Sequence, residues 1–254
     1  MREAWFLGTL ALGLCPGGAT WADDSRLAPF EARYELFRNG KPIGETSISF
    51  AILDDHWTLK SDTRGTHGLA RFLGAEEHSR SEGDWHAGKP RPLTFREEVN
   101  VAMVTHRVSA DFDWAAGTIH STWKDGTATV PTQPGAIDTG SVTLLLRTGL
   151  AAGQENWKLP VLDDDELDEQ TYQAAPAERI DTALGCLAVR KVERIRPPGN
   201  LRYTRTYQAS DLAWVPVLVV HGKQGGDHLE SHIASLTLDG EAVAPGPPCT
   251  PEEG

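Results

Sequence analysis

The chain has 254 residues, with 24 Lys and Arg against 36 Asp and Glu, so its formal net charge is −12. This acidic balance, with a pI of about 5.2, excludes a general role in coating nucleic acid, because that role needs clustered Lys and Arg along the phosphates. The one long apolar run is N-terminal and too short to span a bilayer, so no segment of the sequence is predicted to cross a membrane. A chain of this length buries a core without help from a metal.

The N-terminus has the features of an export signal. Residues 4–14 form an apolar stretch of signal-peptide length, and residues 16–18, Pro-Gly-Gly, break it. Residues 20–22, Thr-Trp-Ala, then place small side chains at the two key positions of a cleavage site. The sequence therefore predicts a signal peptide over residues 1–22 and a periplasmic location for the exported chain.

The chain has three cysteines, and the first, Cys15, lies within the predicted signal peptide. A lipoprotein needs a small residue before its lipidated Cys, and Leu14 is bulky, so we favour a soluble exported protein over a lipid-anchored one. In an oxidising compartment Cys186 and Cys249 could pair. Cys249 lies in a Pro- and Gly-rich tail, residues 240–254, that we expect to be flexible. A disulfide that holds this tail and two separate thiols are both open.

From residue 29 onward, short segments of alternating polar and apolar residues recur between turn sequences, which predicts an antiparallel β-meander. Residues 30–36 alternate in this way and lead into Asn39-Gly40, a hairpin turn. The further expected strands cover residues 43–52, 57–59, 93–99, 102–112, 118–123, 128–130, 157–161, 170–175, 187–195, 202–207, 215–220 and 228–238. No internal repeat or linker interrupts this series, so we expect one β-rich domain over residues 23–239.

Two segments depart from the strand period and predict short helices. Residues 66–74 space Leu69, Phe72 and Leu73 as one apolar helical face. Residues 141–150 form the second expected helix. Its N-terminal cap has three candidates: Asp138, Thr139 and Ser141. The expected fold class is all-β and mainly antiparallel, a curved meander sheet or incomplete β-barrel with two short plugging helices.

Motifs that carry chemistry are scarce. The sequence has no Gly-x-Ser-x-Gly elbow, no phosphate-binding Gly-rich loop and no Cys-x-x-Cys pair. Nucleophilic catalysis needs a nucleophile, a base and an orienting group brought together in space, and the sequence does not single out such a set. We therefore nominate no catalytic residue and expect no cofactor.

Two groups of side chains could ligate a metal ion. His228 and His232 would share one face of the last strand with Glu230 between them, and His221 could lie across the hairpin, so these residues could meet on a zinc ion. Residues 163–169 contain six carboxylates but lack the central Gly and closing Glu of a calcium loop. We favour solvated histidines and a solvated acidic turn over metal sites.

Several short motifs, in their order along the chain, resemble an exported bacterial family known as domain of unknown function 3108. The matching stretches are residues 30–34, 39–45, 68–69, 80–83, 91–95, 138–142, 185–194 and 211–217. The resemblance covers roughly residues 28–238 and implies an exported, β-rich protein, with no catalytic residues to carry over. By architecture such proteins are similar to periplasmic lipoprotein carriers of the Lol type, in which an incomplete barrel holds acyl chains under helices, although a shared fold does not transmit function.

A curved sheet under helical plugs makes an apolar concavity, the usual shape of a ligand site. The predicted ligand-binding residues are the apolar plug positions Leu69, Phe72, Leu73, Val142, Leu145 and Leu146, for which simple core packing is the alternative. We expect a non-enzymatic periplasmic carrier or binding protein for a lipid or other apolar ligand. The alternatives are an envelope hydrolase acting on lipid or polysaccharide, and a scaffold module that binds another envelope protein along a sheet edge.

Overall fold

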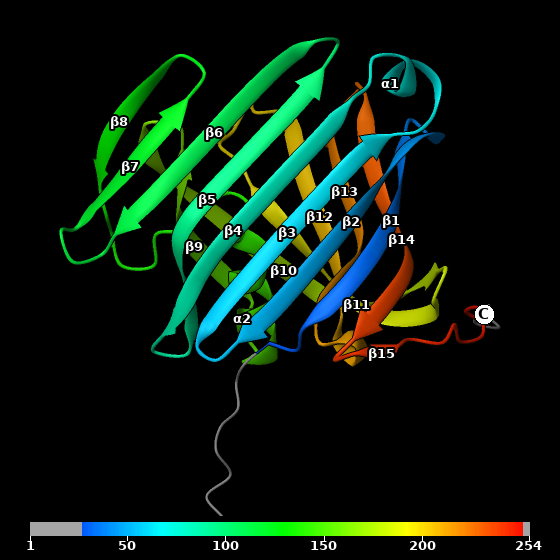
Figure 1. Ribbon diagram of the computed structural model, residues 1–254. Coiled ribbons are helices and arrows are strands. Elements are labelled where there is room, and N and C mark those ends of the chain that lie inside the picture. Colours follow the sequence, from blue (N-terminus) through cyan, green and yellow to red (C-terminus); the bar gives the residue numbers. More distant parts are fainter. Residues whose placement is uncertain (1–26, 251–254) are drawn as a thin grey trace, which may run out of the picture.

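The computed structural model describes residues 27–250, in which fifteen strands form one sheet that curls into a barrel-like wall (Figure 1). In chain order the strands are β1 (Phe30–Arg38), β2 (Lys41–Leu53), β3 (His56–Gly65), β4 (Glu76–His86), β5 (Lys89–Val101), β6 (Val104–Asp113), β7 (Thr118–Trp123), β8 (Gly126–Pro131), β9 (Asn156–Asp163), β10 (Glu166–Thr182), β11 (Gly185–Ile195), β12 (Arg202–Ala209), β13 (Val215–Lys223), β14 (His228–Leu238) and β15 (Glu241–Ala242). Neighbouring strands follow the order β8-β7-β6-β5-β4-β3-β2-β1-β14-β13-β12-β11-β10-β9, and β15 pairs with β14. The predicted all-β antiparallel fold is confirmed.

The barrel is incomplete along one line, which we call the seam, between the end strands β8 and β9. The segment that follows β8 places Ile137 in a short parallel bridge with Val161 of β9. There the Ile137 amide donates to the Pro160 carbonyl (3.0 Å), and the Leu162 amide donates to the Ile137 carbonyl (2.8 Å). Leu162 also packs in a core cluster with residues of β5 to β8, so apolar side chains make contact across the seam.

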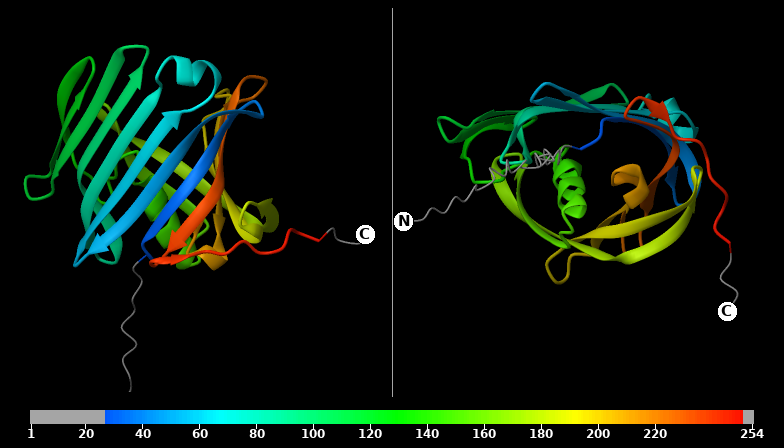
Figure 2. Two further views of the ribbon diagram at one scale, coloured as in Figure 1. Left: turned by 45° about the vertical axis from the view of Figure 1, so that its right-hand side comes forward. Right: turned by 90° about the horizontal axis from the view of Figure 1, so that it is seen from below.

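Helix α2 (Val142–Ala151) lies inside the barrel at one end, near the short 3₁₀ helix η1 (Ser210–Leu212) (Figure 2). Leu144 packs in the core cluster to which β1 to β3 and β11 to β14 contribute, while Leu146 and Leu150 pack in the cluster built on β9 to β11. The helix therefore joins the two walls of the barrel. We call this end the floor, and the opposite end, where β1 turns into β2 and β13 turns into β14, the mouth.

Helix α1 (Gly68–Phe72) corrects the prediction of two plugging helices. It connects β3 to β4 at the mouth, and Leu69 and Phe72 are 69% and 84% exposed, whereas Leu73 is half-buried. The residue that faces the sheet is Ala70, because β3 ends in Gly65, where an added Cβ would lie only 2.8 Å from that of Ala70. This close approach fixes the rotation of the helix and turns its large apolar side chains outward.

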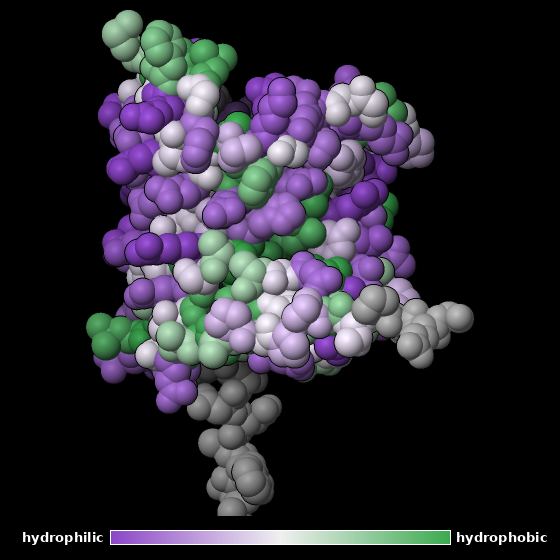
Figure 3. All heavy atoms as spheres, turned by 90° about the vertical axis from the view of Figure 1, so that its right-hand side faces the viewer, coloured by the Kyte–Doolittle hydropathy of each residue, from purple (hydrophilic) through white to green (hydrophobic). Residues whose placement is uncertain are grey.

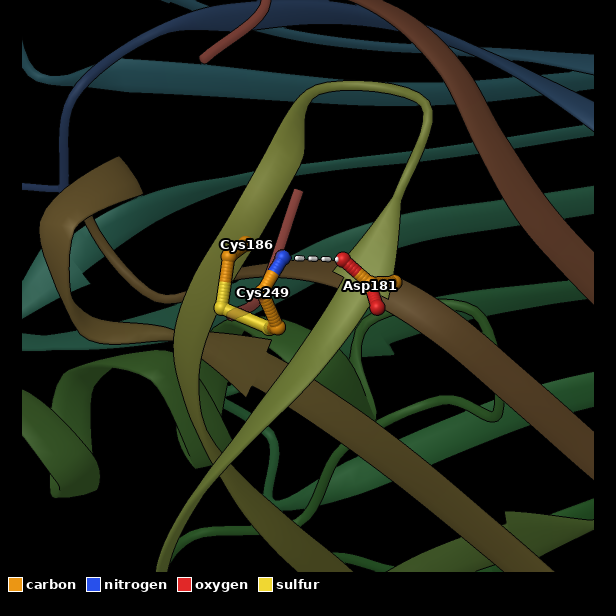
Figure 4. Close-up of side chains that lie close together, drawn as sticks. All are labelled: Asp181, Cys186 and Cys249. Carbon is orange, nitrogen blue, oxygen red and sulfur yellow. Dashed lines mark hydrogen bonds between the residues drawn. A yellow bond between two sulfur atoms is a disulfide. The ribbon is translucent and has the colours of Figure 1, made fainter. Parts of the chain in front are cut away.

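The C-terminal tail is held against the sheet over its described part. Cys186 and Cys249 form a disulfide, which decides between the two alternatives for these cysteines. The Cys249 amide donates to Asp181 Oδ1 (2.6 Å), and the Cys186 amide donates to the Pro247 carbonyl (2.9 Å) (Figure 4). Residues 240–250 are thus fastened to the β10–β11 hairpin, where the sequence predicts a flexible tail.

The predicted signal peptide, residues 1–22, lies outside the described residues. Among residues 27–250, no helix combines the length and the apolar character needed to cross a membrane.

Candidate ligand-binding cavity

The concave face of the sheet encloses a cavity of about 670 Å³. Its lining runs from α2 at the floor to residues near the mouth, among them Phe37 of β1 and His221 of β13. Within residues 27–250 no helix lies across the mouth (Figures 1 and 2). Small-molecule sites typically have volumes of roughly 300–1,000 Å³, so this cavity is the candidate site.

The lower part of the cavity is apolar. Val142 and Leu146 project into it from α2, and Phe30, Leu59 and Val161 line it from three different strands. Most of these side chains also belong to the packed core beneath the cavity. The floor is therefore a continuation of the core surface, which suits an aliphatic group.

The structure brings only part of the predicted ligand-binding set to this site. Val142 and Leu146 line the cavity, whereas Leu145 is partly buried and packs against the core cluster built on β9 to β11. Three predicted residues do not line the cavity: Leu69, Phe72 and Leu73. Their segment lies at the outer edge of the mouth, because the close approach of Ala70 to Gly65 turns the larger apolar side chains outward.

One wall near the mouth carries two carboxyl groups, Glu77 of β4 and Glu97 of β5. In the β4–β5 register Ser79 faces Glu97, so Glu77 and Glu97 are diagonal neighbours on the concave face. Burial raises the pKa of Glu77, and burial followed by repulsion from Glu77 and Asp164 raises the pKa of Glu97. Both carboxyl groups therefore take up a proton more readily than ordinary glutamates do.

The wall across the barrel is cationic. Arg194 of β11 lines the cavity and donates to Asp168 Oδ2 (2.9 Å). Burial, followed by repulsion from Arg194, lowers the pKa of Arg196, whose Nε atom is buried without a hydrogen-bond partner in the described structure. Burial, and then repulsion from Arg196, also lowers the pKa of His221, which favours the neutral imidazole.

We expect Glu77→Gln combined with Glu97→Gln to raise the melting temperature at pH 8 by more than at pH 4. The folded-state pKa values are raised, so the stability these carboxyls contribute is complete below their unfolded pKa and is lost as pH rises through the folded pKa. Thermal denaturation at the two pH values measures the difference. The control is Glu31→Gln on the exposed outer face of β1, and an equal shift at both pH values in the double variant would contradict the assignment.

The histidines weighed as zinc ligands do not converge. His221 pairs with Leu229 in the β13–β14 register, so strand alternation puts it on the face opposite His228 and His232. Glu230 instead contacts both of the latter, with its carboxylate 2.8 Å from His232 Nε2 and 3.4 Å from His228 Nε2. His221 thus lies across the hairpin, as the sequence suggests, but on the opposite face, so the three histidines cannot meet on one ion.

In the described part of the chain, one group of three metal-ligating side chains meets within 4.8 Å, namely Asp181, Cys186 and Cys249 (Figure 4). The two sulfur atoms are bonded to each other, so they supply no thiolate. This group is a covalent attachment point for the tail.

The sequence predicted the strands that carry Glu97 and Arg194 but missed β4, which carries Glu77. From Glu76 to Glu82, β4 is polar at every position, so its concave-facing positions do not alternate with its outward-facing ones. Without an apolar period the segment indicates neither a strand nor a helix. The charged wall therefore had no local signal in the sequence.

These features define a class: an incomplete, barrel-like antiparallel sheet with a helical floor and a cavity open at the other end. A model of the family DUF3108, described as a protein of unknown function, matches residues 30–226. The chain belongs to this family, which confirms the resemblance found in its motifs. No curated protein matches the chain.

Among solved structures, the chain is similar to a beta-barrel-like protein of domain of unknown function DUF1849 from Brucella abortus. The two share 12% identity with a TM-score of 0.56, over 84% of this chain and 98% of that one, which shows a common fold. Weaker likenesses are to MucB (12% identity, TM-score 0.32, 91% of this chain and 58% of that one) and to the hypothetical protein CT021 from Chlamydia trachomatis (8%, 0.36, 89% and 93%).

Proposed function

We propose that this protein is a non-enzymatic binding or carrier protein of the cell envelope, and that its cavity holds an amphiphile with an apolar chain. One observation carries the proposal: a cavity of about 670 Å³ has an apolar floor and a charged, partly buried upper wall. The apolar chain would lie against Val142 and Leu146, and the polar end would lie between the Glu77–Glu97 wall and Arg194.

Two further features support an envelope location. The predicted signal peptide directs export, and the Cys186–Cys249 disulfide is the kind of bond that persists in an oxidising compartment. Native mass spectrometry of protein purified from its own periplasm tests the proposal directly. A co-purified lipid mass would support it, and an apo mass under gentle conditions would count against it.

Val142→Trp is expected to weaken binding of a fluorescent fatty acid by about tenfold, because overfilling a packed site costs about 1–3 kcal/mol. The measurement is a fluorescence titration of each purified variant. Ala151→Trp is the matched control, since Ala151 is exposed at the other end of α2 and does not line the cavity. Equal affinities for the two variants would show that the probe does not occupy the floor.

The Glu77–Glu97 pair favours a second candidate, an envelope hydrolase acting on lipid or polysaccharide, because carboxyls with raised pKa in a cavity are candidate general acids. The double Gln variant separates the two functions. A carrier retains ligand binding and shows no turnover in either form. A hydrolase cleaves an envelope lipid or glycan fraction, and the double variant loses that activity while still binding.

A further inference from the structure

A group of large apolar side chains is exposed at the mouth of the barrel. We call this group the rim knob; its members are Leu69, Phe72, Val101, Met103 and Val104. Phe72 is 84% exposed and Met103 is fully exposed. A hydrophobic prominence stands out at the upper left of Figure 3, at the mouth end of the molecule.

The rim knob is one surface, although its residues come from two segments. Helix α1 supplies two of them and the β5–β6 turn supplies the other three. The two segments are joined by a backbone hydrogen bond, in which the Ala102 amide donates to the Leu73 carbonyl (2.9 Å). The apolar side chains are thus held together, and they extend outward from a fixed backbone.

The rim knob borders the cavity. A smaller pocket of about 160 Å³ lies beneath α1 and is lined by Ala70 and Val101. This pocket shares Leu36, Ile43 and Glu77 with the lining of the main cavity. A surface that contacts the rim knob therefore lies directly beside the cavity mouth.

Large exposed apolar residues are concentrated at this end of the barrel. Apart from the rim knob, Ile195, Leu201 and Leu229 are also exposed there, each beside a strand end at the mouth. Among the described residues, the single large apolar side chain exposed at the floor end is Leu53, at the end of β2. This uneven distribution between the two ends is unusual, because exposed apolar residues that are scattered over a surface have no preferred end.

A cation lies within the rim knob. Segments 64–77 and 97–107, which contain the rim knob and the two wall glutamates, hold three arginines and four glutamates. Glu76 and Glu98 are each paired, with Arg64 (3.1 Å) and Arg107 (2.7 Å). Arg71 is the basic residue in the last turn of α1, between Ala70 and the exposed Phe72.

We infer that the rim knob inserts into the surface of an anionic lipid bilayer. Protruding apolar side chains with an adjacent cation are the features that bind a membrane interface, where the apolar groups enter the acyl boundary and the cation meets lipid phosphates. The insertion places the cavity mouth at the level of the headgroups. It does not depend on whether the cavity holds a ligand.

Vesicle flotation tests this inference, with vesicles of phosphatidylcholine and phosphatidylglycerol. The wild-type protein should float with these vesicles, and float less with phosphatidylcholine alone. The affinity of the combined variant Leu69→Ser, Phe72→Ser and Met103→Ser for the vesicles should fall by at least about tenfold. Full burial of even one such side chain would raise the affinity by about tenfold or more. Leu53→Ser is the matched control, with an apolar side chain that is 77% exposed at the opposite end.

Three outcomes would overturn the inference: a wild-type protein that does not float, a combined variant that floats like wild type, or a control that loses binding equally. Sedimentation velocity tests whether the rim knob binds a second copy of the chain instead. Self-association of the wild-type protein that is lost in the combined variant, together with no flotation, would assign the surface to that second copy. Circular dichroism checks the fold of each variant. Fatty-acid titration without vesicles should be unchanged in the combined variant, so failure here is distinct from failure of the carrier function.

Discussion

Arg147→Ala is expected to lower the free energy of unfolding by about 3–5 kcal/mol, because it leaves a cavity in the floor and takes the hydrogen-bond donor away from two backbone carbonyls. Arg147 has no exposed surface, and its guanidinium donates to the carbonyls of Ala28 (3.2 Å) and Ala213 (3.1 Å). The guanidinium carbon also lies 4.7 Å from the ring centre of Phe30 and 5.5 Å from that of Phe50. One side chain therefore joins α2 to the N-terminal entry, to the β12–β13 connection and to the core aromatics.

The Arg147 contacts also hold a strained stretch of backbone. Ala213 and Trp214 have φ values of 50° and 60°, in the left-handed region that costs a non-glycine residue free energy. Losing the donor to the Ala213 carbonyl leaves a buried acceptor unpaired as well as this strain uncompensated. Because burial lowers the pKa of Arg147 to about 10, the cation itself is held at a cost.

Arg147→Met separates these contributions. Methionine fills much of the same space without a charge, so this variant should recover part of the stability that alanine loses. Urea denaturation monitored by tryptophan fluorescence gives both values. A cost below about 1 kcal/mol for the alanine variant would show that the guanidinium contacts do not hold the floor in place.

Asp138→Ala is expected to cost about 2–4 kcal/mol, because Asp138 is fully buried and accepts three hydrogen bonds. Its carboxylate accepts from the Ser141 amide (2.9 Å), from Ser141 Oγ (2.8 Å) and from Ser81 Oγ of β4 (2.6 Å). The first two bonds hold Ser141, the N-cap residue of α2, and the third fastens this segment to the sheet. Alanine would leave these donors buried without an acceptor.

Asp138→Asn is the control for this second prediction. Asparagine keeps an acceptor oxygen at the same place and removes the cost of the charge, since burial raises the pKa of Asp138. It should therefore lose much less stability than the alanine variant in the same denaturation measurement. If asparagine and alanine were equally destabilising, the loss of these hydrogen bonds would not be the cause.

The sequence predicted elements where burial follows strand alternation and failed where it does not. β7 and β14 match their expected bounds residue for residue, because each packs one face on the core. The floor helix was found because its leucines recur at helical spacing against two core clusters. β4 was missed because its concave face is polar, and the orientation of α1 was missed because it is set by the approach of Ala70 to Gly65, which periodicity cannot register.

The candidate site shows the same division. Val142 and Leu146 could be predicted because they are apolar and helical, but Glu77, Glu97 and Arg194 lie far apart in the sequence. Only the register of β4 with β5, and the curl that brings β11 across from them, places these charges around one cavity. Such pairings depend on the closure of the whole sheet and leave no local pattern.

The seam gives the barrel a compliance that a closed barrel lacks. Every other strand boundary from β8 round to β9 is spanned by a ladder of backbone hydrogen bonds, whereas the seam has the two bonds at Ile137 and a set of side-chain contacts. Widening the cavity there breaks few hydrogen bonds, and the apolar contacts can slide without a fixed register. The seam is therefore the strand boundary at which the wall can widen while the other hydrogen-bonded ladders stay intact.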